Sequence, residues 1–303
     1  MKLDRYLWVW TTSDIVQDAM RTNRFLSTIA SLNATNVFLY IPATNYLKLK
    51  SELTSFIQKL TNLNIKAWGM DGDRSYLSDS VGPNGIYISV NNMIQYNAQV
   101  PKVSQFYGFE TDIEPADQTS FLTFHNDIAD SKLDTKSGGI WYKSQKADRQ
   151  MLMSNWLKIH ETLKTKLSKS NLKLGASLPW WLDNYNGEPI QTTYKTVYAD
   201  MVTHFSIILD EMHYMTYNTW PENVINRMTP KLQKLSNLEV KMCSGMETVL
   251  GAGPYVSYAD TTGKKSQSAL FLDLQIIENA LGAYSNYKGT CIHDYDSWNA
   301  LIQ

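Results

Sequence analysis

The feature that most constrains the fold is an alternation of short apolar runs with amphipathic helical patterns along the whole chain. Runs rich in β-branched and aromatic residues predict strands at 6–10, 36–41, 65–70, 105–113, 173–178, 210–217, 240–245 and 289–294. Apolar residues at helical spacing predict helices at about 13–32, 46–62, 152–167, 190–205, 221–236 and 265–286, the first with Ser13 as a candidate N-cap. Eight such strands in 303 residues predict an α/β protein, a single closed (β/α)8 (TIM) barrel.

The alternative is a doubly wound open sheet. That fold usually carries a glycine-rich phosphate-binding turn after its first strand, whereas this chain has the glycine-free segment WTTSD at 10–14. No internal repeat, low-complexity segment or linker divides the chain. The sequence therefore predicts one TIM-barrel domain over 1–303, with an insertion at about 115–146 in the connection after the fourth strand.

The charge balance argues against two classes of partner. The chain has 28 Lys and Arg against 29 Asp and Glu, and no basic run exceeds two residues. Nucleic-acid and membrane-surface binding need a clustered positive excess. No apolar stretch approaches a membrane span, and the run at 7–10 is too short for a signal peptide, so we expect a monomer in the cytoplasm, or one secreted after loss of an export signal.

The cysteines and histidines predict no metal or other cofactor. Cys243 and Cys291 are far apart in sequence and match no disulfide framework or metal-ligand spacing, so we expect two small buried residues. His213 is predicted to be a hydrogen-bonded histidine inside the barrel. His125 and His160 are predicted to lie on the surface.

The segment FYGFETDIEP at 106–115 carries the chemistry. Glu110, Asp112 and Glu114 alternate along a strand that is otherwise apolar, so their side chains share one face, with Cα atoms roughly 6–7 Å apart. Three ionised carboxylates at that spacing repel one another, and their burial costs several kcal/mol unless they pair or share protons. This pattern indicates catalysis; the alternative is a structural hydrogen-bond network.

Polar and aromatic residues also follow the other predicted strands. In a TIM barrel, the active site lies where the strands end. Flat indole rings bind the C–H faces of sugars, and carboxylates and amides bind their hydroxyls, so this set predicts a carbohydrate site. The candidate substrate-binding residues are Trp10, Tyr40, Trp68, Asp71, Trp180, Trp181, Asn218, Trp220, Glu247, His293 and Trp298.

Three motifs carry a resemblance to a known family. The segment YGFETDIE at 107–114 resembles the fourth-strand signature D-x-x-D-x-D-x-E of glycoside hydrolase family 18, the chitinase-like barrels. MTYN at 215–218 is similar to the family's sixth-strand M-x-Y-D/N segment, and LGASLPWW at 174–181 to its fifth-strand run. The DIEP segment at 112–115 is also similar to that of uncharacterised barrels related to the family.

The chain departs from the family at three positions. Tyr107 and Glu110 stand where the signature has its first two aspartates. The eighth strand ends IHDYDSW, which places His293 where the family usually has a tryptophan beneath the sugar, with Trp298 a few residues on. The resemblance is therefore more specific for the fold and the fourth strand than for the substrate.

The resemblance implies a mechanism. Glu114 is the expected general acid, which protonates the glycosidic oxygen. Asp112 is expected to orient the substrate's own 2-acetamido group as the nucleophile and to share a proton with Glu110 or Glu114. Tyr217 is expected to donate a hydrogen bond to the same group, and Asn218 to contact the same sugar. The implied substrate is a glycan with N-acetylhexosamine units.

Two other functions remain open. Ile113, Glu114 and Pro115 resemble the N-E-P acid/base segment of a large clan of retaining glycosidases, and Glu247 after the seventh strand is a candidate nucleophile. The second alternative is a chitinase-like lectin that binds glycan without cleaving it. Such lectins usually lack the fourth-strand acid, whereas this chain keeps Glu114.

Overall fold

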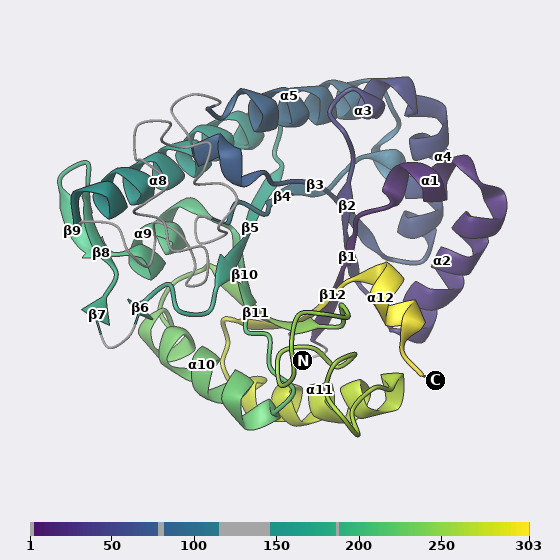
Figure 1. The fold of residues 1–303 in the computed structure, drawn as a ribbon. Coiled ribbons are helices and arrows are strands. Elements are labelled where there is room, and N and C mark those ends of the chain that lie inside the picture. The colour runs from purple at the N-terminus through teal and green to yellow at the C-terminus, as the bar shows by residue number, and fades with distance from the viewer. Residues whose placement is uncertain (1–2, 78–81, 115–145, 186–187, 303) are drawn as a thin grey trace, which may run out of the picture.

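The chain forms a closed eight-stranded barrel inside a ring of helices, as Figure 1 shows along the barrel axis. The computed structural model describes residues 3–77, 82–114, 146–185 and 188–302. The barrel strands are β1 Asp4–Val9, β2 Asn36–Tyr40, β3 Lys66–Asp71, β4 Gly108–Thr111, β5 Lys173–Pro179, β10 Glu211–Met215, β11 Lys241–Glu247 and β12 Tyr287–His293. The predicted TIM barrel and all eight of its predicted strands are confirmed.

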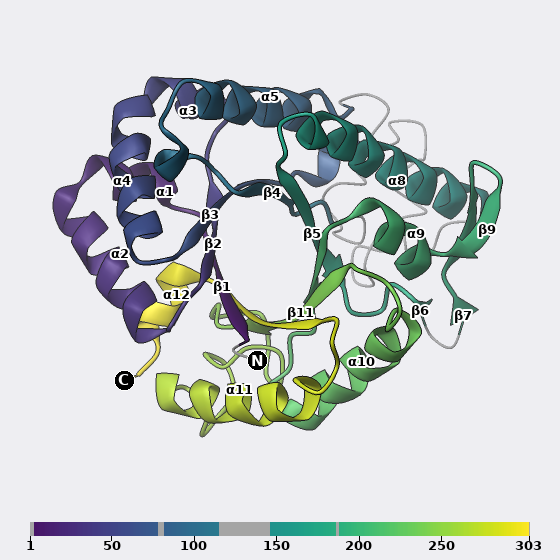
Figure 2. The same cartoon turned by 180° about the vertical axis from the view of Figure 1, so that it is seen from behind.

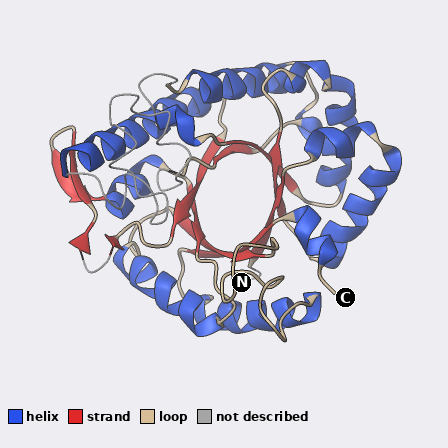
Figure 3. Ribbon diagram, in the orientation of Figure 1, coloured by secondary structure: helices blue, strands red, loops and turns tan. Residues whose placement is uncertain are grey.

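Helices cover the outside of the barrel. Figure 3 shows them in blue around the red strands, and Figure 2 shows the same arrangement from behind. They are α1 Thr12–Gln17, α2 Ala19–Ser31, α3 Asn45–Lys48, α4 Lys50–Asn62, α5 Asn84–Ala98, α8 Lys146–Ser168, α9 Met201–Ile208, α10 Pro221–Lys234, α11 Gln267–Leu281 and α12 Tyr295–Ala300, with the 3-10 turns η1 Arg74–Leu77 and η2 Lys102–Ser104. Two hairpins lie outside the barrel, β6 Asn184–Tyr185 with β7 Glu188–Pro189 and β8 Gln191–Tyr194 with β9 Val197–Asp200.

All eight barrel strands are parallel, and the ring closes where β1 pairs with β12. Because strand side chains alternate between faces, each strand supplies two cores. The outward residues, such as Leu7, Val37 and Leu174, pack under the helices. The inward residues fill the barrel; its apolar part consists of Tyr6, Trp8, Phe38, Trp68, Met70, Cys243 and Cys291.

The first predicted helix is two helices. Asp18 between α1 and α2 has an extended backbone (φ −125°, ψ 117°), and its carboxylate accepts hydrogen bonds from the backbone N–H groups of Met20 and Arg21. Asp18 is therefore the N-cap of α2, because it satisfies N–H groups that have no partner within the helix. Ser13, the predicted N-cap, lies inside α1.

The helix predicted at 190–205 is largely wrong. Residues 191–200 form the β8–β9 hairpin, and the helix α9 begins only at Met201, capped by the side chain of Asp200. Thr192 and Thr193 favour strands through their branched Cβ atoms, which explains the hairpin. Helices α5 and α12 were not predicted, and the insertion expected at 115–146 lies outside the described residues apart from the first residue of α8.

His160 is buried, which corrects the prediction of a surface residue. It lies on the barrel side of α8, where its Nε2 is 2.7 Å from the Thr111 hydroxyl and its Nδ1 is 2.8 Å from the carbonyl oxygen of Trp156. Burial lowers the pKa of His160 to about 4. The ring is therefore neutral near pH 7 and joins α8 to β4. His125 lies outside the described residues.

None of the helices that the structure describes is both long and apolar enough to cross a lipid bilayer.

Asp210 joins three elements at the amino-terminal end of the barrel. Its carboxylate accepts hydrogen bonds from Lys164 of α8 at 2.5 Å, from Lys173 at 3.1 Å and from the backbone N–H of Leu174 in β5 at 2.9 Å. Burial alone would raise the pKa of Asp210, but these contacts outweigh it and lower the pKa below its usual value. The ionised form therefore stabilises the fold.

We predict that Asp210→Asn lowers the free energy of unfolding at pH 7 by about 1–3 kcal/mol, the range for hydrogen bonds to a charged group. Because the folded pKa is depressed, this contribution is present above about pH 4, the unfolded value, and is lost as the pH falls. Urea unfolding of parent and variant at several pH values should show the two converging in acid. Asp14→Asn, which removes an exposed pair with Arg21, is the control and should change stability by about 0.5 kcal/mol or less.

Candidate active site

Glu110 lies inside the barrel and is completely buried. Its Oε2 accepts a hydrogen bond from Nδ1 of His213 at 2.9 Å, and its Oε1 accepts one from the Ser177 hydroxyl at 2.9 Å. Burial raises the pKa of Glu110, opposed by the partly compensating charge of His213. The first carboxylate of the predicted triplet is therefore part of a buried network that spans β4, β5 and β10.

The network continues toward the amino-terminal end of the barrel through Glu211. Its Oε2 lies 3.4 Å from Nε2 of His213 and accepts the Tyr6 hydroxyl at 2.7 Å, and its Oε1 accepts Lys288 at 3.1 Å. Burial would raise the pKa of Glu211, but these partners lower it to about 2. Burial would likewise lower the pKa of His213, but Glu110 raises it well above its usual value.

Gly175 makes the contact between Glu110 and His213 possible. A Cβ atom on Gly175 would lie 2.2 Å from Oε2 of Glu110 and 3.0 Å from Cε1 of His213. Any larger residue would push the carboxylate off the imidazole. The fifth-strand motif at 174–181 thus makes room for this contact, because Gly175 has no side chain.

Asp112 lies just beyond the end of β4, and its Oδ1 is buried with no hydrogen-bond partner among the described residues. Burial and then the charge of Glu114 raise the pKa of Asp112 well above its usual value, against the opposing effect of His293. Gly72 allows this placement, because a Cβ there would lie 2.0 Å from the Asp112 carbonyl oxygen. A carboxyl group in this setting holds its proton to a higher pH than an exposed aspartic acid does.

Tyr217 faces the same space from the end of β10. Burial raises the pKa of Tyr217, and the charges of Glu247, Asp112 and Glu114 raise it further. The hydroxyl therefore stays protonated and can donate a hydrogen bond. Asp112, Glu114 and Glu247 are thus near enough to affect the Tyr217 hydroxyl by their charge, at the end of the barrel where their strands end.

His293 and Glu247 form a pair, as adjacent positions in the register of β11 and β12. Nδ1 of His293 lies 3.0 Å from both carboxylate oxygens of Glu247, and Nε2 accepts the indole N–H of Trp10 at 3.0 Å. Burial lowers the pKa of His293, but Glu247 outweighs that effect and raises it above its usual value. Since an indole nitrogen can only donate, this geometry holds the neutral ring with its proton on Nδ1.

The remaining candidates at the mouth have mixed environments. Trp10 and Tyr40 are half-buried and pack against each other, with ring centroids 5.8 Å apart. Asp71 is buried and accepts the Tyr76 hydroxyl at 3.2 Å. The Asn218 side-chain oxygen accepts the backbone N–H of Trp220 and so shapes the loop after β10.

Four tryptophans differ in their access to a ligand. Trp68 and Trp298 are about 0% and 1% exposed, so in this structure they are packing residues, and the expectation that they form sugar platforms is corrected. Trp181 is nearly buried as well. Trp180, 39% exposed, lies under the guanidinium of Arg227 at 4.1 Å and is open to solvent on the outer side of the barrel, near α10.

Comparison with known proteins adds evidence on the fold alone. No family model matches the chain, and no curated protein matches it. A plant class V chitinase mutant from Cycas revoluta in complex with (GlcNAc)3 has 12% identity and a TM-score of 0.55 over 99% of this chain and 97% of that one. The chain has a chitinase-like barrel.

Two more solved structures share this barrel. The chitinase RmChi1 from Rhizomucor miehei is 12% identical, with a TM-score of 0.53 over 98% of each chain. The spore cortex-lytic enzyme SleL of Bacillus megaterium QM B1551 is 11% identical, with a TM-score of 0.51 over 99% of this chain and 74% of that one.

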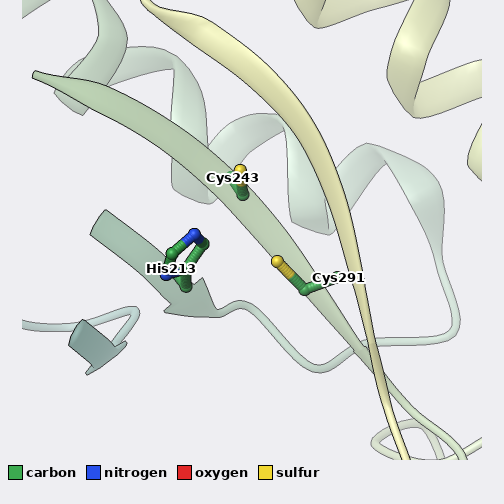
Figure 4. A group of neighbouring side chains, drawn as sticks. All are labelled: His213, Cys243 and Cys291. Carbon is green, nitrogen blue, oxygen red and sulfur yellow. The ribbon is translucent and has the colours of Figure 1, made fainter. Parts of the chain in front are cut away.

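One group of side chains was not predicted. His213, Cys243 and Cys291 converge inside the barrel, where their potential ligand atoms all lie within 4.8 Å of one another (Figure 4). Both cysteines are buried, as expected, and their spacing in the sequence did not indicate that they come together with His213. Their separation in sequence concealed this, because the neighbours β11 and β12 are joined through a long connection. The available signal was that both are at inward positions of their strands.

We predict that Asp112 is protonated at neutral pH in the folded protein. The unfolded chain loses this proton near pH 4, so the parent should lose stability as the pH rises toward the folded pKa. Asp112→Asn, which resembles the neutral acid, should remove this loss, so that its stability relative to the parent increases with pH. Urea unfolding from pH 5 to 8 measures the difference, and exposed Asp296→Asn should show no such trend.

Proposed function

We propose that this protein is a glycoside hydrolase that cleaves a glycan containing N-acetylhexosamine units by a substrate-assisted, retaining mechanism. The observation that carries the proposal is the set of groups around the Tyr217 hydroxyl. Asp112, with its raised pKa, and Glu114 follow β4, while Tyr217 remains a hydrogen-bond donor. A donor and a carboxyl beside a general acid are the groups that an acetamido nucleophile needs.

In this mechanism Glu114 protonates the glycosidic oxygen while the acetamido oxygen of the same sugar attacks the anomeric carbon. Asp112 orients the acetamido N–H, and Tyr217 donates to the acetamido oxygen. Water then opens the cyclic intermediate with Glu114 as the base, which retains the anomeric configuration. The chitinases and the cortex-lytic enzyme that share the barrel support this class of substrate.

The environment of Glu247 favours this mechanism over a two-glutamate retaining mechanism. Oε1 of Glu247 accepts the backbone N–H groups of Thr248 and Val249 at 2.8 Å each, and both carboxylate oxygens contact His293. A carboxylate held by three donors is a weakened nucleophile. Glu247 is better suited to orienting His293 than to forming a glycosyl ester.

The lectin alternative lacks comparable support. A barrel that only binds glycan gains nothing from a destabilised carboxylate, and Asp112 is destabilised in its ionised form by burial and by Glu114. Destabilised titratable groups gather at catalytic sites more often than at simple binding sites. We therefore assign catalysis to this cluster.

The test is a panel of glycans with and without 2-acetamido groups, scored by the release of reducing ends. We expect cleavage only of linkages that follow an N-acetylhexosamine. Glu114→Gln should lower kcat by about 10²–10⁴-fold, the usual contribution of a general acid, with an unchanged melting temperature. Glu222→Gln on the exposed start of α10 is the matched control and should keep the parent's kinetics.

Full activity in Glu114→Gln would show that Glu114 is not the general acid. Cleavage restricted to glycans without an acetamido group would eliminate the substrate-assisted route. A covalent glycosyl-enzyme that forms in the parent and not in Glu247→Gln would establish the two-glutamate mechanism instead. Glycan binding without cleavage would indicate the lectin.

We further predict that His293→Ala weakens glycan binding or turnover at least tenfold while it shifts the melting temperature little. The ring stacks on Tyr217 with centroids 5.9 Å apart and holds Glu247, so its loss frees both groups. His204→Ala, which removes a buried histidine from α9, is the control and should keep its kinetics. A His293→Ala protein that melts early but turns over normally would show that His293 only packs.

A further inference from the structure

We propose that His213, Cys243 and Cys291 form a structural Zn²⁺ site inside the barrel, with Glu211 as the fourth ligand. This site is separate from the proposed glycosidase chemistry. The three side chains come from the neighbouring strands β10, β11 and β12 and lie close together (Figure 4), with their potential ligand atoms within 4.8 Å of one another. Two thiolates and an imidazole are ligands that zinc binds in tetrahedral sites.

The register of the strands brings the ligands together. His213 lies directly opposite Cys243, and Cys291 lies one inward position further along β12, opposite Gly245. The residue opposite Cys243 is Gly289. Each cysteine therefore faces a glycine on one neighbouring strand and a side chain on the other, His213 beside Cys243 and Tyr6 beside Cys291.

The two nitrogens of His213 have different environments. Nδ1 donates to the carboxylate of Glu110, whereas Nε2 is buried and has no hydrogen-bond partner among the described residues. A zinc-bound histidine almost always donates its other N–H to a carboxylate or carbonyl, which fixes the ring and its tautomer. Glu110 occupies that position, and Nε2 becomes a ligand when the metal displaces its proton.

The position of Glu211 fits a metal better than it fits a hydrogen bond. Its Oε2 lies 3.4 Å from Nε2 of His213, and the pair lacks hydrogen-bond geometry. Zn–N and Zn–O bonds of about 2.0–2.2 Å place two tetrahedral ligand atoms about 3.3–3.5 Å apart. The distance between these two atoms is therefore that of ligands on one ion, although the carboxylate of Glu211 has to move toward the sulfurs, because it lies outside the group whose ligand atoms are within 4.8 Å of one another.

The sulfurs need a small adjustment. Zn–S bonds of about 2.3 Å place two tetrahedral sulfurs about 3.8 Å apart, and the observed upper limit is 4.8 Å. Rotation about χ1 of either cysteine supplies a movement of this size without a change in the backbone. Binding expels the thiol protons, and the Nε2 proton where present, because only the deprotonated groups are ligands.

The competing arrangement is an imidazolium between two carboxylates. Glu110, Glu211, Lys288 and a protonated His213 would balance in charge, so charge alone does not distinguish the two. The hydrogen bonds do, because an imidazolium would bury an Nε2–H without an aligned acceptor, at a cost in free energy.

The test is the metal content of the full-length protein, purified without chelators and measured by inductively coupled plasma mass spectrometry. We expect about one zinc per chain. Because the chain has only two cysteines, titration with a mercurial reagent should release that zinc in step with the modification of both thiols. Cys243→Ser and Cys291→Ser should each lower the zinc content at least about tenfold.

The matched control is Ser244→Ala. Ser244 is buried on β11 but points outward, where its hydroxyl lies 2.9 Å from that of Tyr287. This variant loses a buried hydrogen bond in the same strand and should keep its zinc. If the cysteine variants do not fold, the parent produced in cobalt-supplemented medium should show thiolate-to-cobalt charge-transfer absorption.

Three results would overturn the proposal. The first is a parent protein with no zinc and no cobalt absorption. The second is zinc that persists in both cysteine variants. The third is a ¹⁵N spectrum in which both ring nitrogens of His213 carry protons, since that is the imidazolium arrangement.

Discussion

A carboxylate with no access to water lies inside this barrel, and the residues around it supply the hydrogen bonds and the opposite charge that its burial requires. Glu110 needs His213 as a donor, and His213 in turn lies against Glu211, which is held by Lys288. Removing any one partner would leave a buried charge without compensation, which typically costs 3–5 kcal/mol. Gly175 belongs to the same constraint, because only the absence of a side chain lets the first pair meet.

The electrostatics change along the barrel axis. Near the amino-terminal end, Glu211 is ionised and paired with Lys288, so the charges there are fixed. At the mouth, Asp112 is held neutral and Tyr217 keeps its proton. Groups that can exchange protons with a ligand are thus confined to the open end. In the interior, the charged side chains are held in ion pairs.

The strands could be predicted from sequence because each lies in a short, largely apolar run between segments with helical periodicity. The pairing of His293 with Glu247 could also be anticipated, since both end neighbouring strands. The burial of Trp68 could not, because a barrel interior and a binding cleft use the same inward positions at different depths. The sequence indicates which face of a strand a residue is on. It does not indicate how far that residue lies from the mouth of the barrel.

Helical periodicity was a weaker guide than strand alternation. Residues 190–200 form a hairpin although their spacing suggested a helix, because local β propensity prevailed. His160 was predicted to be a surface residue because it lies outside the predicted strands, whereas its ring contacts Thr111 of β4. The cysteine pair was missed for a related reason, as proximity across strands is not encoded in spacing along the chain.

The closure of the ring between β1 and β12 has a consequence for biosynthesis. The first strand leaves the ribosome early, but its partner ends at residue 293. At about 5–20 residues per second, roughly 15–60 s pass before the last strand exists. Throughout that time one edge of β1 has no partner, and an unpaired strand edge can recruit another chain. Any strands that pair before β12 is made therefore form a sheet that is still open at β1, and crowding on a polysome would put such edges next to one another.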